Sequence, residues 1–238
     1  MDFYQVLSRY YDDIFPLKEQ QRDFLRRLIE REGIKSVLDV GCGTGPVCLE
    51  LSDWGLDSVG IDLSQEMVEI ANGKAEARGS HARFIQADML DLSGVKGRFD
   101  GVLCLGNTLA HLSTEGLVEQ ALEQFAAKGK NLLIQVVNYD RILAKKIAEL
   151  PEIRTPDLKF RRYYKHLPNG LIEFSMQVEK GPDKASGVNI LAPLTKERLE
   201  QAFSSTGWEA AGWWGSFGGE VWSPDSPATI VAAKFGVE

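Results

Sequence analysis

An apolar segment at residues 36–40 runs directly into a turn that contains three glycines. The segment has the length and composition of a strand buried in a parallel sheet, and a helical pattern follows at 47–54. Glycine lets the backbone turn tightly and approach a ligand without an obstructing Cβ. In doubly wound sheets, ligands bind at such turns, outside the carboxyl ends of the strands. The turn at residues 41–45 therefore predicts a ligand site, and a tight turn without a ligand remains the alternative.

Strand and helix patterns alternate as far as about residue 150, and repeated units of this kind imply a parallel sheet with helices on both faces. A helix and two strands close the chain. The sequence therefore predicts an α/β, Rossmann-like doubly wound fold with a mostly parallel sheet, formed as a single domain by residues 1–238. The expected helices cover 19–31, 47–54, 65–78, 114–127 and 194–206, and the expected strands cover 36–40, 58–61, 82–86, 101–105, 131–137, 208–215 and 229–235.

The pattern changes at about residue 154. Two extended segments, 159–166 and 171–180, flank an Asn-Gly pair, which is a strong hairpin signal. A third extended segment covers about 187–191. We expect residues 154–192 to form an antiparallel insertion that lies over the carboxyl edge of the main sheet as a lid.

The form of the glycine turn narrows the ligand class. A dinucleotide fingerprint would place its third glycine at position 46, where this chain has Pro46, and the turn also lacks the Gly-Lys-Ser/Thr ending of a phosphate-binding loop. Asp62 ends the second expected strand, where a carboxylate accepts hydrogen bonds from both ribose hydroxyls of a nucleoside. The alternative role for Asp62 is the N-cap of the next helix, but Ser64 is a better candidate for that position than Asp62. The sequence therefore predicts a nucleoside ligand other than NAD or NADP.

The glycine turn, Asp62, the segment Ala87-Asp88-Met89 and the segment Leu105-Gly106-Asn107 occur in the order found in class I S-adenosylmethionine-dependent methyltransferases. The chain resembles that family over its whole cofactor half. The resemblance implies that S-adenosylmethionine is the cofactor. It also implies that Asp88 accepts a hydrogen bond from the adenine amino group and that the Leu105 carbonyl accepts one from the cofactor ammonium. Core packing remains the alternative for Met67 and Met89, and Tyr11 either binds the cofactor or packs. The implied cofactor-binding residues are Tyr11, Asp39, Gly41, Gly43, Asp62, Leu63, Met67, Asp88, Met89 and Leu105.

A closer similarity to the glycine N-methyltransferase family covers roughly residues 35–180. It rests on Leu105-Gly106-Asn107-Thr108-Leu109-Ala110-His111-Leu112, on Asn138-Tyr139-Asp140 and on Arg162-Tyr163-Tyr164-Lys165. The resemblance implies that Asn107, Tyr139 and Tyr164 face the methyl acceptor and that His111 lies near the cofactor. His111 is either a general base or a packed, hydrogen-bonded residue.

One departure from that family concerns the substrate. The glycine enzymes carry an arginine before Asn-Tyr-Asp that clamps the substrate carboxylate, and this chain has Val137 there. Valine cannot replace a bidentate guanidinium. We expect the lid to bring Tyr164, with Arg161 or Arg162 nearby, to the acceptor pocket. Arg161, where the family has an asparagine, is a conceivable displaced clamp. We therefore expect methyl transfer to a small-molecule acceptor, most simply an amine other than free glycine.

The composition of the chain speaks against several other classes of protein. The formal net charge of −7 opposes binding to nucleic acid, and no apolar run approaches the ~20 residues of a membrane span. Three cysteines and three histidines show no metal-ligand spacing and no disulfide framework. We expect a soluble cytoplasmic enzyme without metal. The alternatives are a nucleic-acid (tRNA) or O-methyltransferase and a non-catalytic S-adenosylmethionine-binding module, and the sequence does not indicate the oligomeric state.

Overall fold

The computed structural model describes residues 3–236, except for the side chains at positions 4 and 5. Its main sheet has seven strands in the order β10-β11-β5-β4-β1-β2-β3. The strands from β3 to β5 in this order are parallel, whereas β11 runs antiparallel to both of its neighbours. The predicted α/β doubly wound class is therefore confirmed. The strands are β1 (Ser36–Val40), β2 (Asp57–Asp62), β3 (Arg83–Gln86), β4 (Phe99–Cys104), β5 (Gly129–Val137), β10 (Trp208–Trp214) and β11 (Ala228–Phe235).

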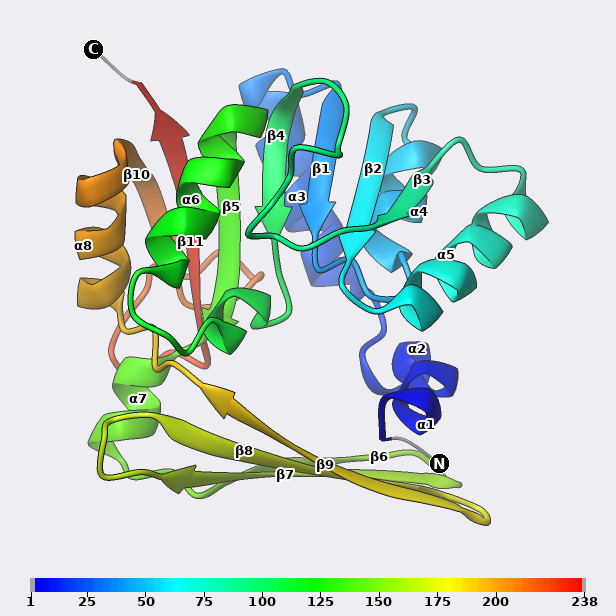
Figure 1. Cartoon of the computed structure of the whole chain (residues 1–238), viewed down its shortest axis with the longest axis vertical. Helices are drawn as coiled ribbons and strands as arrows, with labels where there is room; N and C mark the ends of the chain where they lie inside the picture. The colour runs from blue at the N-terminus through cyan, green and yellow to red at the C-terminus, as the bar shows by residue number, and fades with distance from the viewer. Residues whose placement is uncertain (1–2, 237–238) are drawn as a thin grey trace.

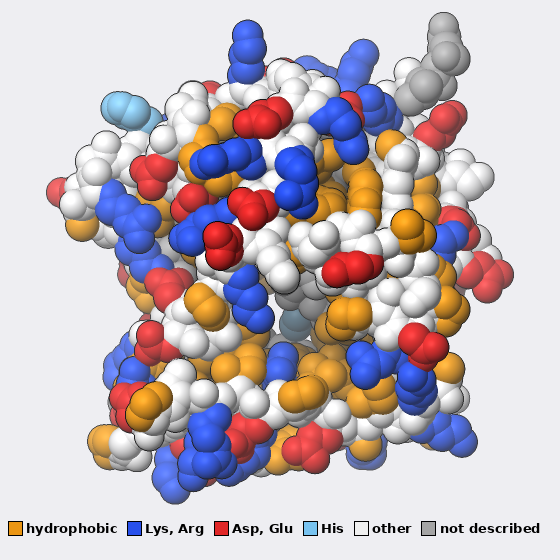
Figure 2. All heavy atoms as spheres, turned by 180° about the vertical axis from the view of Figure 1, so that it is seen from behind, with side chains coloured by type: hydrophobic (Ala, Val, Ile, Leu, Met, Phe, Trp, Pro, Cys, Tyr) orange, Lys and Arg blue, Asp and Glu red, His pale blue; other side chains and the backbone are white. Residues whose placement is uncertain are grey.

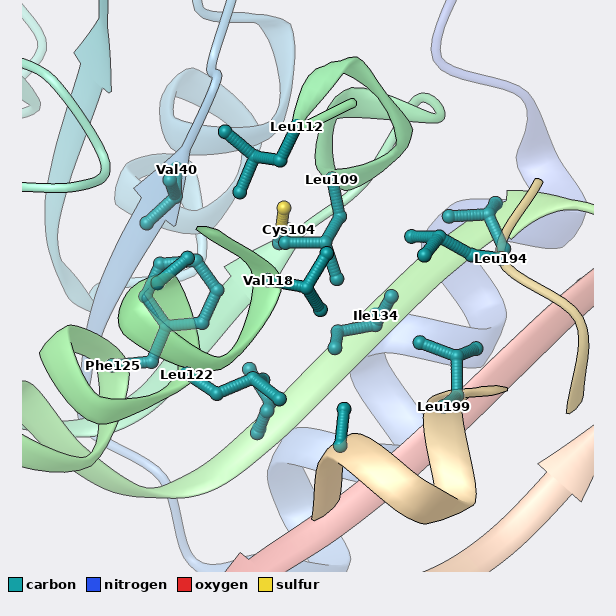
Figure 3. Close-up of a cluster of buried hydrophobic side chains, with 14 of the residues drawn as sticks. Val40, Cys104, Leu109, Leu112, Val118, Leu122, Phe125, Ile134, Leu194 and Leu199 are labelled. Carbon is teal, nitrogen blue, oxygen red and sulfur yellow. The ribbon is translucent and has the colours of Figure 1, made fainter. Parts of the chain in front are cut away.

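Helices cover both faces of this sheet (Figure 1). One face carries α6 and α8, whose apolar side chains pack onto β4 and β5, and Figure 3 shows the centre of this cluster around Leu122, Ile134 and Leu199. The opposite face carries α3, whose Phe24 and Leu28 pack against it. Apolar residues three and four positions apart form a buried stripe along these helices, and this spacing is why the sequence predicted them as helices. The helices are α3 (Glu19–Glu32), α4 (Pro46–Asp53), α5 (Gln65–Arg78), α6 (Leu117–Lys128) and α8 (Lys196–Thr206).

The helix expected at 114–127 begins three residues later, at Leu117. Gly116 precedes it with a φ of 82°, a left-handed conformation that lies outside the helix. Other expected bounds of the main layer differ from the observed ones by a residue or two.

A second sheet lies beyond the carboxyl ends of the parallel strands (Figure 1). It is antiparallel, in the order β6-β7-β8-β9. Its strands are β6 (Glu149–Arg154), β7 (Leu158–His166), β8 (Ile172–Lys180) and β9 (Asp183–Leu191). The sequence predicts three extended segments from about residue 154 onward but does not predict β6, because Pro151 lies within that strand and its pairing with β7 shifts register between Leu150 and Ile153.

Four short elements escaped the sequence analysis: α1 (Phe3–Arg9), α2 (Tyr11–Ile14), the 3₁₀ helix η1 (Thr108–His111) and α7 (Tyr139–Ala144). Helices of four to seven residues are too short to show a period. Tertiary contacts hold them. Asp12 of α2 accepts from the Thr44 hydroxyl at 2.5 Å and pairs with Lys74, and Lys180 of β8 pairs with Asp13 at 2.8 Å. The N-terminal helices thus join the glycine turn to the second sheet.

None of the described helices is long and apolar enough to cross a membrane. The three cysteines are buried and unbonded. Within residues 3–236, no three His, Cys, Asp or Glu side chains come together as metal ligands.

Candidate functional site

The glycine turn joins β1 to α4 at the carboxyl edge of the main sheet. Gly41, Gly43 and Gly45 all have left-handed φ values, of 74°, 56° and 82°. A Cβ on Gly43 would lie 2.9 Å from the Tyr11 ring, so a side chain there would displace the N-terminal segment. The turn therefore needs glycine both for its backbone conformation and for the close approach of Tyr11.

Asp62 fixes this turn from the neighbouring strand. Its Oδ2 accepts from the Gly43 N–H at 2.8 Å, and its Oδ1 accepts from the Ser64 N–H at 2.9 Å. Ser64 in turn caps α5, accepting from the Met67 N–H at 3.3 Å, as the sequence predicted. Each carboxylate oxygen has a second lone pair, so Asp62 keeps the capacity to accept two further hydrogen bonds.

Asp39 is a buried carboxylate beneath the turn. Its side chain is in β1 and only 3% of the residue is exposed. Among the described residues, 3–236, the single hydrogen bond to this carboxylate comes from the Cys48 thiol, a weak donor, at 3.9 Å. Burial and the nearby charge of Asp62 raise the pKa of Asp39 to about 7. The carboxylate is thus poised to gain a cation or a stronger donor.

Tyr11 lies over the same turn. Burial, and the charges of Asp62 and Asp39, raise the pKa of its hydroxyl well above the usual value. The hydroxyl therefore stays protonated as a donor close to two carboxylates. Tyr10 points the other way and donates to Asp183 of β9 at 2.6 Å.

The residues expected around an adenine differ in exposure. Leu63 is 69% exposed, an unusual state for leucine beside a glycine turn, and Asp88 is exposed with Oδ1 accepting from the Leu90 N–H at 2.9 Å. Met89 is partly buried against the main core. Met67 is only 5% exposed, which favours core packing for that residue.

The segment after β4 supplies the polar side chain of Asn107, whose oxygen and nitrogen atoms both form hydrogen bonds. Asn107 has a left-handed φ of 69°. Its Oδ1 accepts from the Val137 N–H at 3.1 Å, and its Nδ2 donates to the Tyr139 hydroxyl at 3.0 Å. The Leu105 carbonyl, expected to meet the cofactor ammonium, accepts here from the hydroxyl of Thr108 at 2.7 Å and from its N–H at 3.3 Å. The Thr108 hydroxyl must rotate before this carbonyl accepts another donor.

Two tyrosines approach each other between the sheets. Tyr139 begins α7 and is fully buried, and Tyr164 of β7 is 4% exposed and packs on Phe174 with ring centroids 5.2 Å apart. Burial raises the pKa of both hydroxyls, to about 12 for Tyr164. The Tyr139 hydroxyl accepts from Asn107 and interacts electrostatically with Tyr164 of the second sheet, so these three side chains form one group. Figure 2 shows the molecule hollowed between the two sheets.

His111 ends η1 and is exposed. Desolvation by neighbouring protein atoms lowers the pKa of its imidazole, which favours the neutral, proton-accepting form. Within residues 3–236 its ring has no hydrogen-bond partner, so the packed, hydrogen-bonded alternative loses its main support.

The two arginines of β7 lie on opposite faces. Arg161 faces away from the main sheet and pairs with Glu152 at 2.7 Å, so it is not a displaced clamp reaching into the site. Arg162 faces inward beside Tyr164. The sequence placed Arg161 or Arg162 near the acceptor pocket without choosing between them; the alternation of side chains along β7, with Leu158, Phe160 and Tyr164 inward, was the signal that could have selected Arg162.

Comparison with known proteins agrees with this architecture. Residues 37–130 match the model of a methyltransferase domain. A glycine/sarcosine N-methyltransferase of Parasynechococcus marenigrum is 39% identical over 129 residues, which are 52% of this chain and 46% of that protein. A glycine/sarcosine/dimethylglycine N-methyltransferase of Actinopolyspora halophila is 28% identical over 225 residues, 91% of this chain and 39% of that protein. The chain thus spans less than two thirds of either relative.

Among solved structures, an S-adenosylmethionine-dependent methyltransferase from Clostridium acetobutylicum superimposes with a TM-score of 0.84 at 14% identity, over 98% of this chain and 99% of that one. The CcbJ methyltransferase from Streptomyces caelestis gives the same TM-score, 0.84, at 18% identity over 99% of both chains. The chain therefore shares the fold of these methyltransferases, and its residues 37–130 match a methyltransferase domain. Its sequence resembles the glycine N-methyltransferase family.

Proposed function

We propose that this protein transfers a methyl group from S-adenosylmethionine to an amine nitrogen of a small molecule. The observation that carries the proposal is the group formed by Asn107, Tyr139 and Tyr164. It lies beyond the carboxyl ends of β4 and β5, on the same edge of the main sheet as the glycine turn. The names of the relatives, which are amine methyltransferases, support an amine as the acceptor.

The residues around the glycine turn suit the cofactor. Gly41 and Gly43 offer a backbone surface without Cβ atoms, and Asp62 has lone pairs free for the two ribose hydroxyls. Asp39 lacks a strong donor, and the ammonium of the cofactor would supply one, directly or through water. Tyr11 closes the turn from above. Leu63, Met89 and Asp88 would border the adenine, with Met67 supporting them from the core.

The cofactor supplies an activated methyl group, whose bond to sulfur breaks as the nitrogen lone pair forms the new bond to carbon. The protein mainly holds the amine in line and excludes water, because positioning alone supplies much of the rate. Asn107 and Tyr139 offer oxygen atoms that orient the amine hydrogens. Tyr164, in the second sheet, closes the site as part of a lid. His111 in its neutral form is available to take the proton that the product releases.

The absence of a carboxylate clamp at Val137 leads to a prediction about glycine. A carboxylate that enters a closed site unpaired pays several kcal/mol in desolvation. We expect kcat/KM for glycine and for sarcosine below ~10⁴ M⁻¹s⁻¹, under the ordinary enzyme range. Steady-state methyl transfer assays measure both values. A higher value for either amino acid would contradict this prediction.

A screen with S-adenosylmethionine labelled in its methyl group tests the proposed function. Amines, alcohols, thiols and tRNA are supplied as separate pools of acceptors. Label transferred to an amine supports the proposal, and label transferred only to hydroxyls, thiols or tRNA contradicts it. Cofactor binding without transfer to any pool would identify a binding module.

A further inference from the structure

Two neighbouring arginines on β7 have opposite surroundings. Arg161 pairs with Glu152 at 2.7 Å and with Glu179 at 3.9 Å, on the outer face of the second sheet. Arg162 forms no ion pair with any carboxylate of residues 3–236. Its Nη2 donates to the Pro151 carbonyl at 2.9 Å, and its Nε is buried without a partner.

The pairing of the strands places Arg162 on the face toward the main sheet. Directly opposite it are Leu150 on β6 and Met176 on β8, and Met176 is buried against the N-terminal helices. Tyr164 follows two residues later on the same face. The Arg162 guanidinium lies 5.6 Å from the centre of the Phe160 ring and also interacts electrostatically with the Tyr164 hydroxyl.

A guanidinium in this position is costly unless an anion joins it. Desolvation lowers the pKa of Arg162, although the group remains charged at every physiological pH. Its planar fork of N–H donors matches a carboxylate. The described side chains around it, Leu150, Phe160, Tyr164 and Met176, supply no negative charge. A half-buried guanidinium without a counter-ion, on the face toward the main sheet, suits a binding site better than a stabilising contact.

We propose that Arg162 binds a carboxylate of the methyl acceptor, and that an apolar spacer separates this carboxylate from the amine that is methylated. The inference rests on the proposed function for the position of the amine, beside Asn107 and Tyr139. A single guanidinium among apolar side chains favours a singly charged carboxylate over a more highly charged phosphate.

The spacer follows from the geometry of β7. Arg162 and Tyr164 are two residues apart along the strand, about 7 Å. The amine and carboxylate of an α-amino acid are separated by two bonds only, which is too short to reach both positions. The rings of Tyr164 and Phe174, with centroids 5.2 Å apart, would pack against an apolar or aromatic spacer.

Two probes that differ only in the anion test the proposal. They are para-(aminomethyl)benzoate and para-methylbenzylamine, each assayed for methylation by wild type, Arg162→Gln, Arg162→Lys and Arg161→Gln. Wild type should favour the acid by about 10- to 100-fold in kcat/KM, the size of a lost charge-assisted hydrogen bond. Arg162→Gln should abolish this preference, Arg162→Lys should retain part of it, and Arg161→Gln should leave it unchanged.

A binding measurement separates this inference from the proposed function. Calorimetry with para-toluate on protein saturated with S-adenosylhomocysteine should show binding that Arg162→Gln loses and Arg161→Gln keeps. If neither amine is methylated but this binding pattern is found, the subsite stands and amine methylation of such acceptors fails. If both amines are methylated equally by wild type, or if Arg162→Gln keeps the preference, the subsite is overturned and methyl transfer stands. No methylation together with no para-toluate binding would overturn the subsite as well.

Thermal unfolding of the same variants checks that they fold. Arg162→Gln should unfold at the wild-type temperature or above it, because the substitution removes a desolvated charge without a counter-ion. A variant that unfolds below wild type would show that Arg162 supports the lid structure, and the Arg162→Lys result would then decide the proposal.

Discussion

Asp62→Ala should weaken the binding of S-adenosylhomocysteine by about 100-fold. The pair of charge-assisted hydrogen bonds to the ribose is expected to contribute about 1.5–3 kcal/mol in total, and the substitution would remove the acceptor of both hydroxyls. It also removes the carboxylate that holds the Gly43 N–H at 2.8 Å and the Ser64 N–H at 2.9 Å, so the glycine turn loses its support. Isothermal titration calorimetry measures the affinity.

Asp57→Ala is the matched control for this experiment. Asp57 begins the same strand at its opposite end, where its carboxylate pairs with Arg83 on the surface at 2.8 Å. This control should bind S-adenosylhomocysteine as wild type does. Asp62→Asn, which keeps one acceptor oxygen, should fall between wild type and Asp62→Ala. Equal affinity of wild type and Asp62→Ala would remove Asp62 from the cofactor site.

Asp39→Asn should stabilise the ligand-free protein at pH 8 by about 2–4 kcal/mol relative to wild type. Burial raises the pKa of Asp39 from 3.8 to about 7, so the native state holds this proton more tightly than the unfolded state does. The stability that comes from this proton is fully present below about pH 4 and is lost as the pH rises through 7. Asparagine does not titrate, so the advantage of the variant should vanish at low pH. Urea unfolding at several pH values measures the difference.

The control for this pH dependence is Asp100→Asn. Backbone N–H donors from Lys35 and Ser36 lower the pKa of Asp100, so its stabilising effect is present above its usual titration range and is lost as the pH falls. Its variant should therefore be less stable than wild type at pH 8, opposite in sign to Asp39→Asn. If Asp39→Asn is no more stable than wild type at pH 8, the interpretation of Asp39 as a buried carboxylate with a raised pKa is contradicted.

The same substitution should cost the protein affinity for its cofactor. If Asp39 meets the ammonium, Asp39→Asn should bind S-adenosylhomocysteine about 10-fold more weakly at pH 8, as expected for the loss of a charged partner. Wild-type affinity should rise as the pH increases through about 7, where the carboxyl ionises. A gain in stability combined with a loss of binding would show that the burial of Asp39 serves ligand binding.

The sequence by itself determined the layered fold. Strands β1 to β5 and helices α3 to α6 have apolar patterns that depend on local spacing alone, and the glycines of the turn report a backbone conformation that other residues rarely adopt. These signals also located Asp62 and the segment after β4. They could not show α1, α2 and α7, because helices of this length form only when tertiary contacts hold them.

Tertiary structure alone decided the surroundings of the polar side chains. Arg161 and Arg162 are adjacent and identical in type, yet the pairing of β7 with β6 and β8 gives the first two carboxylates and leaves the second without one among the described residues. The hydrogen bond from Asn107 to Tyr139 and the weak thiol contact of Asp39 likewise join residues far apart or on different elements. A sequence specifies which faces are buried through its periodicity, but which charge meets which partner depends on how strands and helices pack, and that information is not local.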